Sequence, residues 1–266
     1  MRRIIYYLPH LLLPLIILSL DQGCYSKDIK VEKANAKLDG LYDKLRRLDL
    51  KGERAGYTKA MRMKRAEIAR GFLQIGKPSI AYLIGKIERI NQLEGQVFKS
   101  RDEVTPEELV NYFFRLRREQ IPVSLKHDIL FILAEMSKDH LDEQGLIIRI
   151  MIKSLAPPMY VRDTGGVYFW ALLKVGRPIV SELIDLLNHP NETIRCLALS
   201  SLIRIRAESE DAYKLLPEEK SEAVLSFSYK CKASIEERRE PIEMWRRWYN
   251  LHEKDIKVPV LPSWFD

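Results

Sequence analysis

Two stretches of the chain, one hundred positions apart, carry the same pattern and decide the fold. Residues 72–78 read FLQIGKP, and residues 172–178 read LLKVGRP. In each stretch an apolar run ends in glycine, which suits the left-handed position that closes a helix. A basic residue follows, and then a proline, which suits the first turn of a new helix. The pattern predicts two helices joined by a very short turn, and its turn residues are Gly76, Pro78, Gly176 and Pro178.

Similar apolar segments follow both turns. Residues 79–87 read SIAYLIGKI and residues 179–187 read IVSELIDLL, with apolar side chains at helical spacing in both. A single pair of such helices cannot bury its apolar face, so each pair has to stack on a neighbouring pair. Repetition of this kind is typical of a helical repeat protein.

The repeat resembles those of the HEAT-repeat family, in particular the short HEAT-like repeats of the phycobilisome-lyase type. As in those repeats, the second helix is followed by a polar turn, residues 188–192, and by a helix that opens on Ile194 and Arg195. Residues 162–206 carry the whole pattern, and residues 66–90 carry part of it. The resemblance implies an all-α fold, a right-handed α-solenoid of stacked antiparallel helix pairs with about ten or eleven helices.

Helical spacing extends beyond the repeat. Residues 31–48 place an apolar side chain at every third or fourth position. This spacing predicts a helix that packs on the next helix or, as an alternative, associates with a second copy of the chain. Thr105–Glu108 predicts a helix start with a capping box after a polar loop at residues 93–104. The apolar face of that helix is expected to consist of Leu109, Phe113 and Leu116.

Aromatic residues in the second half of the chain are expected inside the protein. The run Tyr168–Trp170 is expected to fill the core between repeats. Near the C-terminus, Ile242, Trp245 and Trp248 share one helical face, which is expected to cover the last repeat. The predicted organisation is a signal peptide or anchor at 1–24, a helical segment at 25–60, the solenoid at 61–251 and an extended C-terminal tail at 252–266.

The first 24 residues have the pattern of a secretory signal. Arg2 and Arg3 precede the apolar run Ile4–Leu20, and polar residues follow it. This run is 17 residues long and contains two prolines, so it lies at the short limit for a membrane-spanning helix. The sequence therefore predicts either a cleaved signal peptide or an N-terminal membrane anchor.

Cys24 is a candidate for lipid attachment. Gly23 precedes it, and in this respect the segment resembles a bacterial lipoprotein signal, in which the cysteine after a small residue is acylated. Asp21 stands where such signals carry leucine. The alternative is ordinary cleavage near Gly23 or Ser26. A doubly acylated Cys24 would hold the protein on a membrane.

The positive charge of the chain is concentrated in one segment. Residues 37–70 contain eleven Lys and Arg against five Asp and Glu, a net charge of +6 out of +7 for the whole chain. Such an excess attracts anionic partners over a long range. On an exported protein we expect acidic proteins or anionic lipids rather than nucleic acid, while the alternative is an ordinary solvated helix face. The candidate contacts are Arg46, Arg47, Arg54, Arg62, Lys64 and Arg65.

Motifs that support catalysis are sparse. Residues 85–86, Gly-Lys, lack the surrounding pattern of a phosphate-binding loop. The five histidines are scattered, and no metal site is predicted. The neighbours His127–Asp128 and Asp139–His140 cannot face one another on a helix, so we expect both pairs at the surface. Cys196 and Cys231 are expected as packed thiols, with a disulfide as the alternative.

These observations favour a non-catalytic protein-interaction scaffold, exported to a bacterial cell envelope, either periplasmic or membrane-anchored. It would bind a protein partner along the solenoid surface without a cofactor. One alternative is an enzyme or a small-ligand-binding protein, because HEAT-like repeats also resemble parts of phycobilin lyases. A buried carboxylate in a pocket beside Trp170 or Trp245 would favour it. The other alternative is a structural subunit that self-associates through the N-terminal helix.

Overall fold

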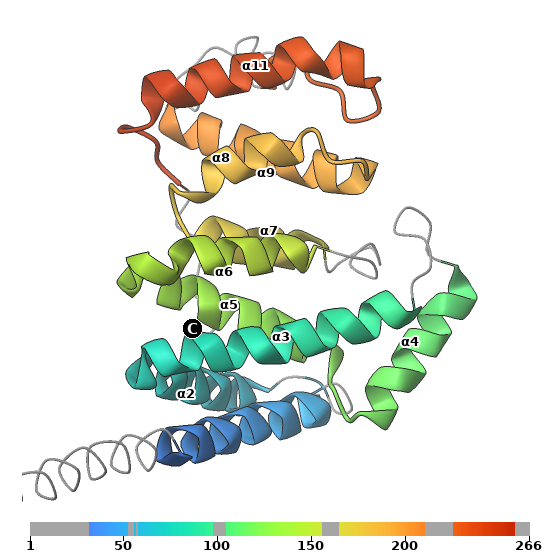
Figure 1. Ribbon diagram of the computed structural model, residues 1–266, viewed down its shortest axis with the longest axis vertical. Coiled ribbons are helices and arrows are strands. Elements are labelled where there is room, and N and C mark those ends of the chain that lie inside the picture. Colours follow the sequence, from blue (N-terminus) through green and yellow to red (C-terminus); the bar gives the residue numbers. More distant parts are fainter. Residues whose placement is uncertain are drawn as a thin grey trace, which may run out of the picture.

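The computed structural model describes residues 32–52, 56, 58–97, 105–155, 165–210 and 226–258. Within these ranges the chain is helical and has no strand, which confirms the predicted all-α class (Figure 1). The first helix covers residues 32–52. The helices after it are α2 (Lys59–Ile75), α3 (Lys77–Val97), α4 (Pro106–Arg118), α5 (Val123–Asp139), α6 (Leu141–Lys153), α7 (Gly165–Lys174), α8 (Ile179–Leu186), α9 (Glu192–Ser209) and α11 (Ile235–His252).

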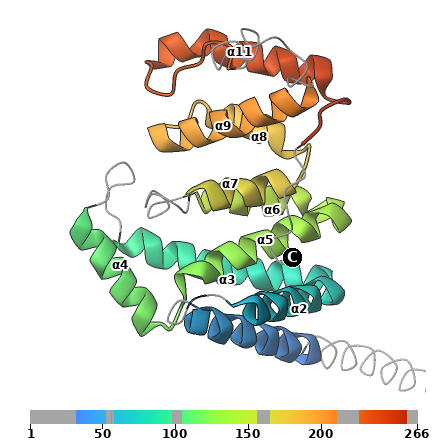
Figure 2. The same cartoon turned by 180° about the vertical axis from the view of Figure 1, so that it is seen from behind.

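The helices stack along the long axis of the molecule, and helix 32–52 forms one end of the stack (Figures 1 and 2). Helices α2, α5, α7 and α9 form a row in which each member contacts the next. A second set of helices lies beside this row; in it α3 contacts α6, and α8 contacts α11. The contacts between α3 and α5, α5 and α6, and α8 and α9 join the two sets. An apolar face that one helix cannot bury by itself is thus covered by the helices of the neighbouring layer.

The two glycine turns have the same backbone geometry. Gly76 and Gly176 have φ angles of 73° and 91°, in the left-handed region that favours glycine. The amide of Gly76 donates to the Leu73 carbonyl at 3.1 Å, and that of Gly176 donates to the Leu173 carbonyl at 3.0 Å. In both turns the residue three positions later donates back to the glycine carbonyl, at 2.8 and 3.2 Å. The repeated sequence pattern therefore corresponds to a repeated backbone turn.

Side-chain caps explain why several helices begin where they do. Thr105 and Glu108 form the predicted capping box at the start of α4. The Asn191 side chain accepts from the Ile194 amide at 3.2 Å at the start of α9. A further capping box, built on Ser234, opens α11. These local signals fix helix boundaries without any help from distant parts of the chain.

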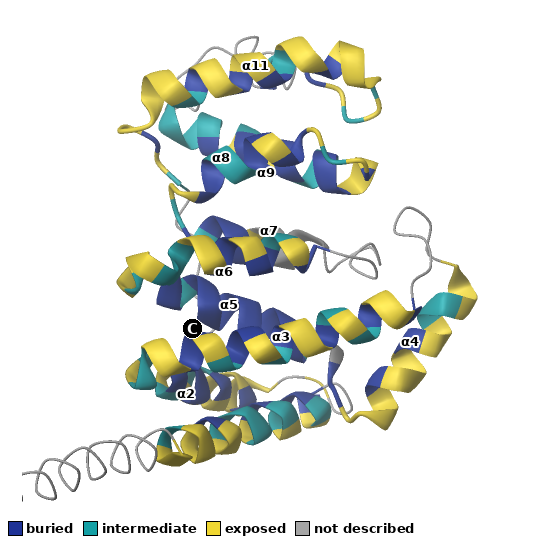
Figure 3. Cartoon of the chain, in the orientation of Figure 1, coloured by how far each residue is buried: buried dark blue, intermediate teal, exposed yellow. Residues whose placement is uncertain are grey.

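The middle of helix α5 is buried on all sides. Residues 125–134 are all buried, and α5 contacts α2, α3, α6 and α7 (Figure 3). Seven of these ten side chains are apolar, as expected for a helix that no face exposes to water. The other three are Lys126, His127 and Asp128, so charged groups enter the core here.

A buried ion-pair cluster joins α5 to the first two helices. The Arg65 guanidinium on α2 donates to both carboxylate oxygens of Asp128 on α5, with Nε–Oδ2 at 2.8 Å. Its Nε also lies 3.3 Å from a carboxylate oxygen of Asp49 on helix 32–52. All three side chains are buried. A buried charge is tolerated only when it is paired, so this cluster ties three helices together.

A second buried pair involves Lys126, two residues before Asp128 and on a different side of α5. The Lys126 ammonium donates to Glu94 of α3 at 2.6 Å, and the Tyr112 hydroxyl of α4 donates to the other carboxylate oxygen at 3.0 Å. Burial raises the pKa of Glu94 and lowers the pKa of Lys126, while the two groups oppose these shifts in each other. The pair therefore links α3, α4 and α5 in a place that water does not reach.

These contacts correct the prediction for His127 and Asp128. Both side chains are buried, whereas Asp139 is exposed and His140 is half-buried. The prediction for the first pair was wrong because it considered contacts within one helix. Asp128 is paired with Arg65 on α2, and residue spacing along α5 does not reveal such a partner.

Three further expectations need correction. Residues 93–97, expected in a loop, are the last part of α3. On α4 the inner face holds Tyr112 where Phe113 was expected, and Phe113 is 43% exposed. Trp170 is 42% exposed and so does not fill the core, because it lies on an outer face of α7. The polar composition of residues 93–97 did not indicate a loop, and the aromatic side chains of Phe113 and Trp170 did not indicate burial. The position of the neighbouring helix decides which face of a helix is buried.

The two ends of the described chain agree with the predicted packing. Leu38 and Leu45 of helix 32–52 are buried in the common core, so this face packs within the same molecule. At the other end α11 packs on α8, and Ile242, Trp245 and Trp248 are buried. Residues 1–31 and 259–266, which include the predicted signal and most of the predicted tail, lie outside the described residues.

The ion-pair cluster allows a stability prediction. Replacing Asp128 with Asn removes the bidentate partner of a buried guanidinium, so we expect the free energy of unfolding to fall by about 3 kcal/mol. The matched control is Asp185→Asn, which breaks an exposed pair with Arg246 and is expected to lose less than about 1 kcal/mol. Urea denaturation followed by circular dichroism measures both. Equal losses in the two variants would show that Arg65 is not held as described.

A second prediction concerns pH. Burial lowers the pKa of His127 to about 4, and the nearby Lys126 and Arg65 cations act in the same direction. In the unfolded chain the histidine binds a proton near pH 6.5. Between these values the unfolded state holds more protons, so stability falls as the pH falls from about 6.5 to 4. In His127→Gln this decrease is expected to be smaller, as measured by urea denaturation at pH 7 and 4.5. The same pH dependence in wild type and variant would exclude His127 as its source.

Candidate functional site

A groove lies between helix 32–52 and α2, at the end of the stack. It has a volume of about 400 Å³, which is within the range of sites that bind ligands or partner side chains. Both walls are helices, so its lining residues are held on rigid elements. The lining consists of Leu41, Lys44, Arg47, Leu48, Lys64, Glu67 and Ile68.

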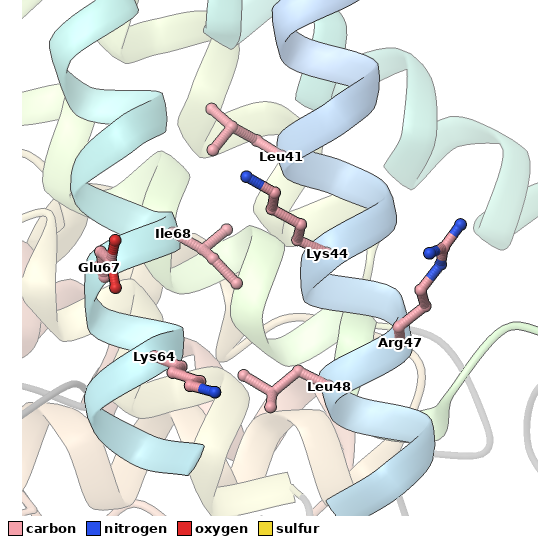
Figure 4. A pocket seen from close by; sticks show the side chains of 7 residues that line it. All are labelled: Leu41, Lys44, Arg47, Leu48, Lys64, Glu67 and Ile68. Carbon is pink, nitrogen blue, oxygen red and sulfur yellow. The ribbon is translucent and has the colours of Figure 1, made fainter. Parts of the chain in front are cut away.

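The floor of the groove is apolar. Figure 4 shows Leu41, Leu48 and Ile68 pointing into the space between the two helices. Leu41 and Leu48 are seven residues apart, so they lie two turns apart on the same face of one helix. Ile68 is buried, and the two leucines are half-buried. A partner that covers this floor would remove the remaining apolar surface from water.

Positive charge surrounds the floor. Lys44, Arg47 and Lys64 are exposed, and in the part of the chain that the structure describes none of them forms an ion pair. The amines of Lys44 and Lys64 lie at the space between the helices, whereas Arg47 points outward from helix 32–52 (Figure 4). Glu67 contributes one carboxylate to the lining. The groove therefore has a net positive charge that the described residues do not neutralise.

The structure separates the six predicted basic contacts. Arg47 and Lys64 line the groove, and Arg62 is exposed nearby on α2. Arg46 is half-buried and pairs with Asp43 at 3.2 Å. Arg54 lies outside the described residues.

The prediction was wrong for Arg65. Its guanidinium is buried and holds Asp128 and Asp49, so it cannot contact a partner. The sequence alone did not distinguish this arginine from its exposed neighbours, because its partner Asp128 lies on α5, sixty-three residues later in the chain.

Sequence reasoning missed the floor and one of the lysines. Lys44 was counted in the basic segment but was not chosen as a contact, and Glu67 was counted only as an opposing charge. The spacing of Leu41 and Leu48 was interpreted as a helix face that packs on the next helix or on a second copy of the chain, not as part of a groove. Both leucines lie at the edge of the helix–helix contact, which only the positions of the two helices reveal.

Lys86, in the Gly-Lys pair of residues 85–86, has a structural role. Its ammonium lies 4.6 Å from the ring centres of both Tyr42 and Tyr82, and 3.6 Å from Asp39. The Tyr82 hydroxyl donates to Asp39 at 2.5 Å. These contacts fasten helix 32–52 to α3 and thereby hold one wall of the groove.

The two cysteines that the structure describes are free thiols, as the sequence favoured. Cys196 and Cys231 form no disulfide. Burial, together with a hydrogen bond to Cys231, raises the pKa of Cys196 to about 12. A thiol with a raised pKa is a poor nucleophile, because the thiolate is the reactive form. Among the described residues no three His, Cys, Asp or Glu side chains are placed to hold a metal ion.

The tryptophan cluster at the other end of the stack is part of the core. Trp245 is fully buried and lies edge-on to Phe227 and Trp248, with ring centres 5.0 and 5.6 Å away. The nearby carboxylate of Glu210 accepts from the Trp248 indole at 2.8 Å and from Arg206 at 2.9 Å. This carboxylate is therefore occupied by structural contacts.

Comparison with protein-family models, with curated proteins and with solved structures finds no match. The likeness to HEAT repeats rests on the chain's own turn motif at Gly76 and Gly176. The function is therefore inferred from the charge and shape of the groove and from the arrangement of the helices around it.

The exposed lysines at the groove are expected to contribute nothing to folding. Because Lys44 and Lys64 have no ion-pair partner among the described residues, the double variant Lys44→Ala/Lys64→Ala should change the free energy of unfolding by less than about 0.5 kcal/mol. Leu45→Ala, at a buried position on the same helix, should lose about 2–5 kcal/mol. Urea denaturation compares them. A large loss in the lysine variant would mean that these side chains hold the two helices together.

Proposed function

We propose that this protein is a non-catalytic interaction scaffold that binds a protein partner with an acidic surface along its stack of helices. The groove between helix 32–52 and α2 is the main contact. The observation that carries this proposal is the pair of exposed lysines, Lys44 and Lys64, beside an apolar floor, with exposed Arg47 pointing outward from the helix that forms one wall (Figure 4).

The two parts of the groove have different roles in binding. Exposed cations that are not neutralised within the chain attract an acidic partner, which raises the association rate and suppresses basic competitors. The apolar floor contributes affinity when a partner side chain covers Leu41 and Leu48, since the centre of an interface is where most of the binding free energy arises. Arg62 extends the basic surface along α2.

The proposed architecture is a right-handed α-solenoid of HEAT-like helix pairs. The matching turns at Gly76 and Gly176 and the two sets of stacked helices support it. A solenoid exposes a long surface relative to its size, which suits the binding of an extended partner. A partner that occupies the groove could continue along α2 toward the neighbouring layers.

The proposed location is a bacterial cell envelope. The charged and apolar pattern of residues 1–24 supports export, and Cys24 is the proposed lipid attachment site if this segment is processed as a lipoprotein signal. Within the described ranges, every helix is too short or too polar to cross a bilayer. Attachment to a membrane through the N-terminus would therefore depend on residues outside those ranges.

The test is a binding titration with charge-reversed variants. A partner is captured from an envelope extract, identified, purified and titrated against the wild type and Lys44→Glu/Lys64→Glu. We expect the variant to bind at least about tenfold more weakly, and wild-type affinity to fall as salt is raised, because the contact is electrostatic.

The matched control is Arg149→Glu/Lys153→Glu, which reverses two exposed charges on α6. It changes the net charge by the same amount at a different place and should keep wild-type affinity. If the two double variants weaken binding equally, net charge rather than the groove determines the affinity, and the assignment of the groove is wrong.

A further inference from the structure

Helix α4 stands out to one side of the stack (Figures 1 and 2). Its main contact is with α3. The inner face is held by buried Tyr112 and Leu116 and by a hydrogen bond from Arg115 to Gln96 at 3.0 Å. Apart from half-buried Glu108 and Leu109, the rest of the helix is exposed (Figure 3). This helix therefore has an outer face that no described helix covers.

The outer face of α4 carries a second apolar stripe. Val110, Phe113 and Phe114 are 52%, 43% and 65% exposed. Their spacing of three and four residues places them on one side of the helix, with Phe113 next to the buried stripe and Val110 and Phe114 farther from it. Two exposed phenylalanines side by side are unusual on a surface that only contacts water.

Arginines border this stripe. Arg117 follows Phe113 and Phe114 on the same side of the helix, and Arg118 lies next to it. Both are exposed, and neither forms an ion pair within the described ranges. The acidic residues of the helix, Glu107 and Glu108, are in its first turn, where Glu108 serves the capping box. In the C-terminal half of α4, two exposed phenylalanines are thus followed within about one turn by two exposed arginines.

We propose that the outer face of α4 lies on an anionic lipid surface. An interfacial helix buries Phe and Val at the boundary between headgroups and acyl chains, while the long side chains of neighbouring arginines reach the phosphates. The charge of the two free arginines complements anionic headgroups. The face is a convex ridge along a projecting helix, which fits a broad deformable surface such as a bilayer.

This proposal does not depend on the groove, because the two sites share no residue. It adds a membrane contact to the scaffold. If both hold, a partner bound at the groove would be kept close to the membrane surface.

The test uses hydrogen exchange of the full chain on vesicles. Total vesicle binding is not the measure, because residues 4–20 are apolar and can bind lipid by themselves. Vesicles of phosphatidylglycerol and phosphatidylcholine are compared with phosphatidylcholine alone. We expect amide exchange in α4 to slow at least about threefold on the anionic vesicles only, while exchange in α11 stays unchanged.

Two variants and one control complete the experiment. Phe114→Asp should abolish the protection of α4, and Arg117→Gln/Arg118→Gln should remove most of it, because the affinity for the anionic surface falls about fivefold for each charge lost. The control Leu251→Asp changes an apolar side chain that is 79% exposed on α11, and it should behave as wild type. Circular dichroism of each variant checks that the helices are intact.

Three outcomes overturn the proposal. The first is unchanged exchange in α4 while the chain is bound to anionic vesicles. The second is equal protection on the neutral vesicles, which excludes a role for the arginines. The third is protection by soluble polyglutamate but not by vesicles, which would point to an acidic protein at this face.

Discussion

The structure depends on the burial of α5 on all sides. A helix that has no exposed face must be surrounded by other helices, and α2, α3, α6 and α7 do this. The same burial dictates what happens to Lys126 and Asp128, since a charge in such a place needs a partner of opposite sign. Glu94 and Arg65 are those partners. The apolar packing and the two buried ion pairs are therefore consequences of one constraint.

This constraint also determines the shape of the groove. Through Arg65, α5 holds both α2 and Asp49 of helix 32–52. Arg65 faces inward, while Lys64, its neighbour in the sequence, is exposed at the groove. Adjacent residues on one helix thus have opposite roles, because one points to the core and the other to solvent. The structure uses part of a basic segment for stability and leaves the rest available for binding.

Local features were predictable because their causes are local. The turns at Gly76 and Gly176 need a residue that tolerates positive φ, and the caps at Thr105 and Asn191 need a side-chain acceptor beside free amides. Long-range features were harder to predict. Arg65 and Asp128 are paired although they lie sixty-three residues apart in the sequence, and no spacing rule connects them. For the same reason Trp170 and Phe113 were assigned to the inside of the protein, although both are substantially exposed.

The sequence by itself determined that the chain is helical, where several helices begin and that positive charge gathers in residues 37–70. Periodicity, capping and charge are properties of neighbouring residues, so they can be read without coordinates. Only the tertiary structure decided which cations are buried, that Leu41 and Leu48 border a groove, and that α4 has an uncovered apolar face. Each of these depends on the position of a second helix, and that position is set by packing between residues far apart in the chain.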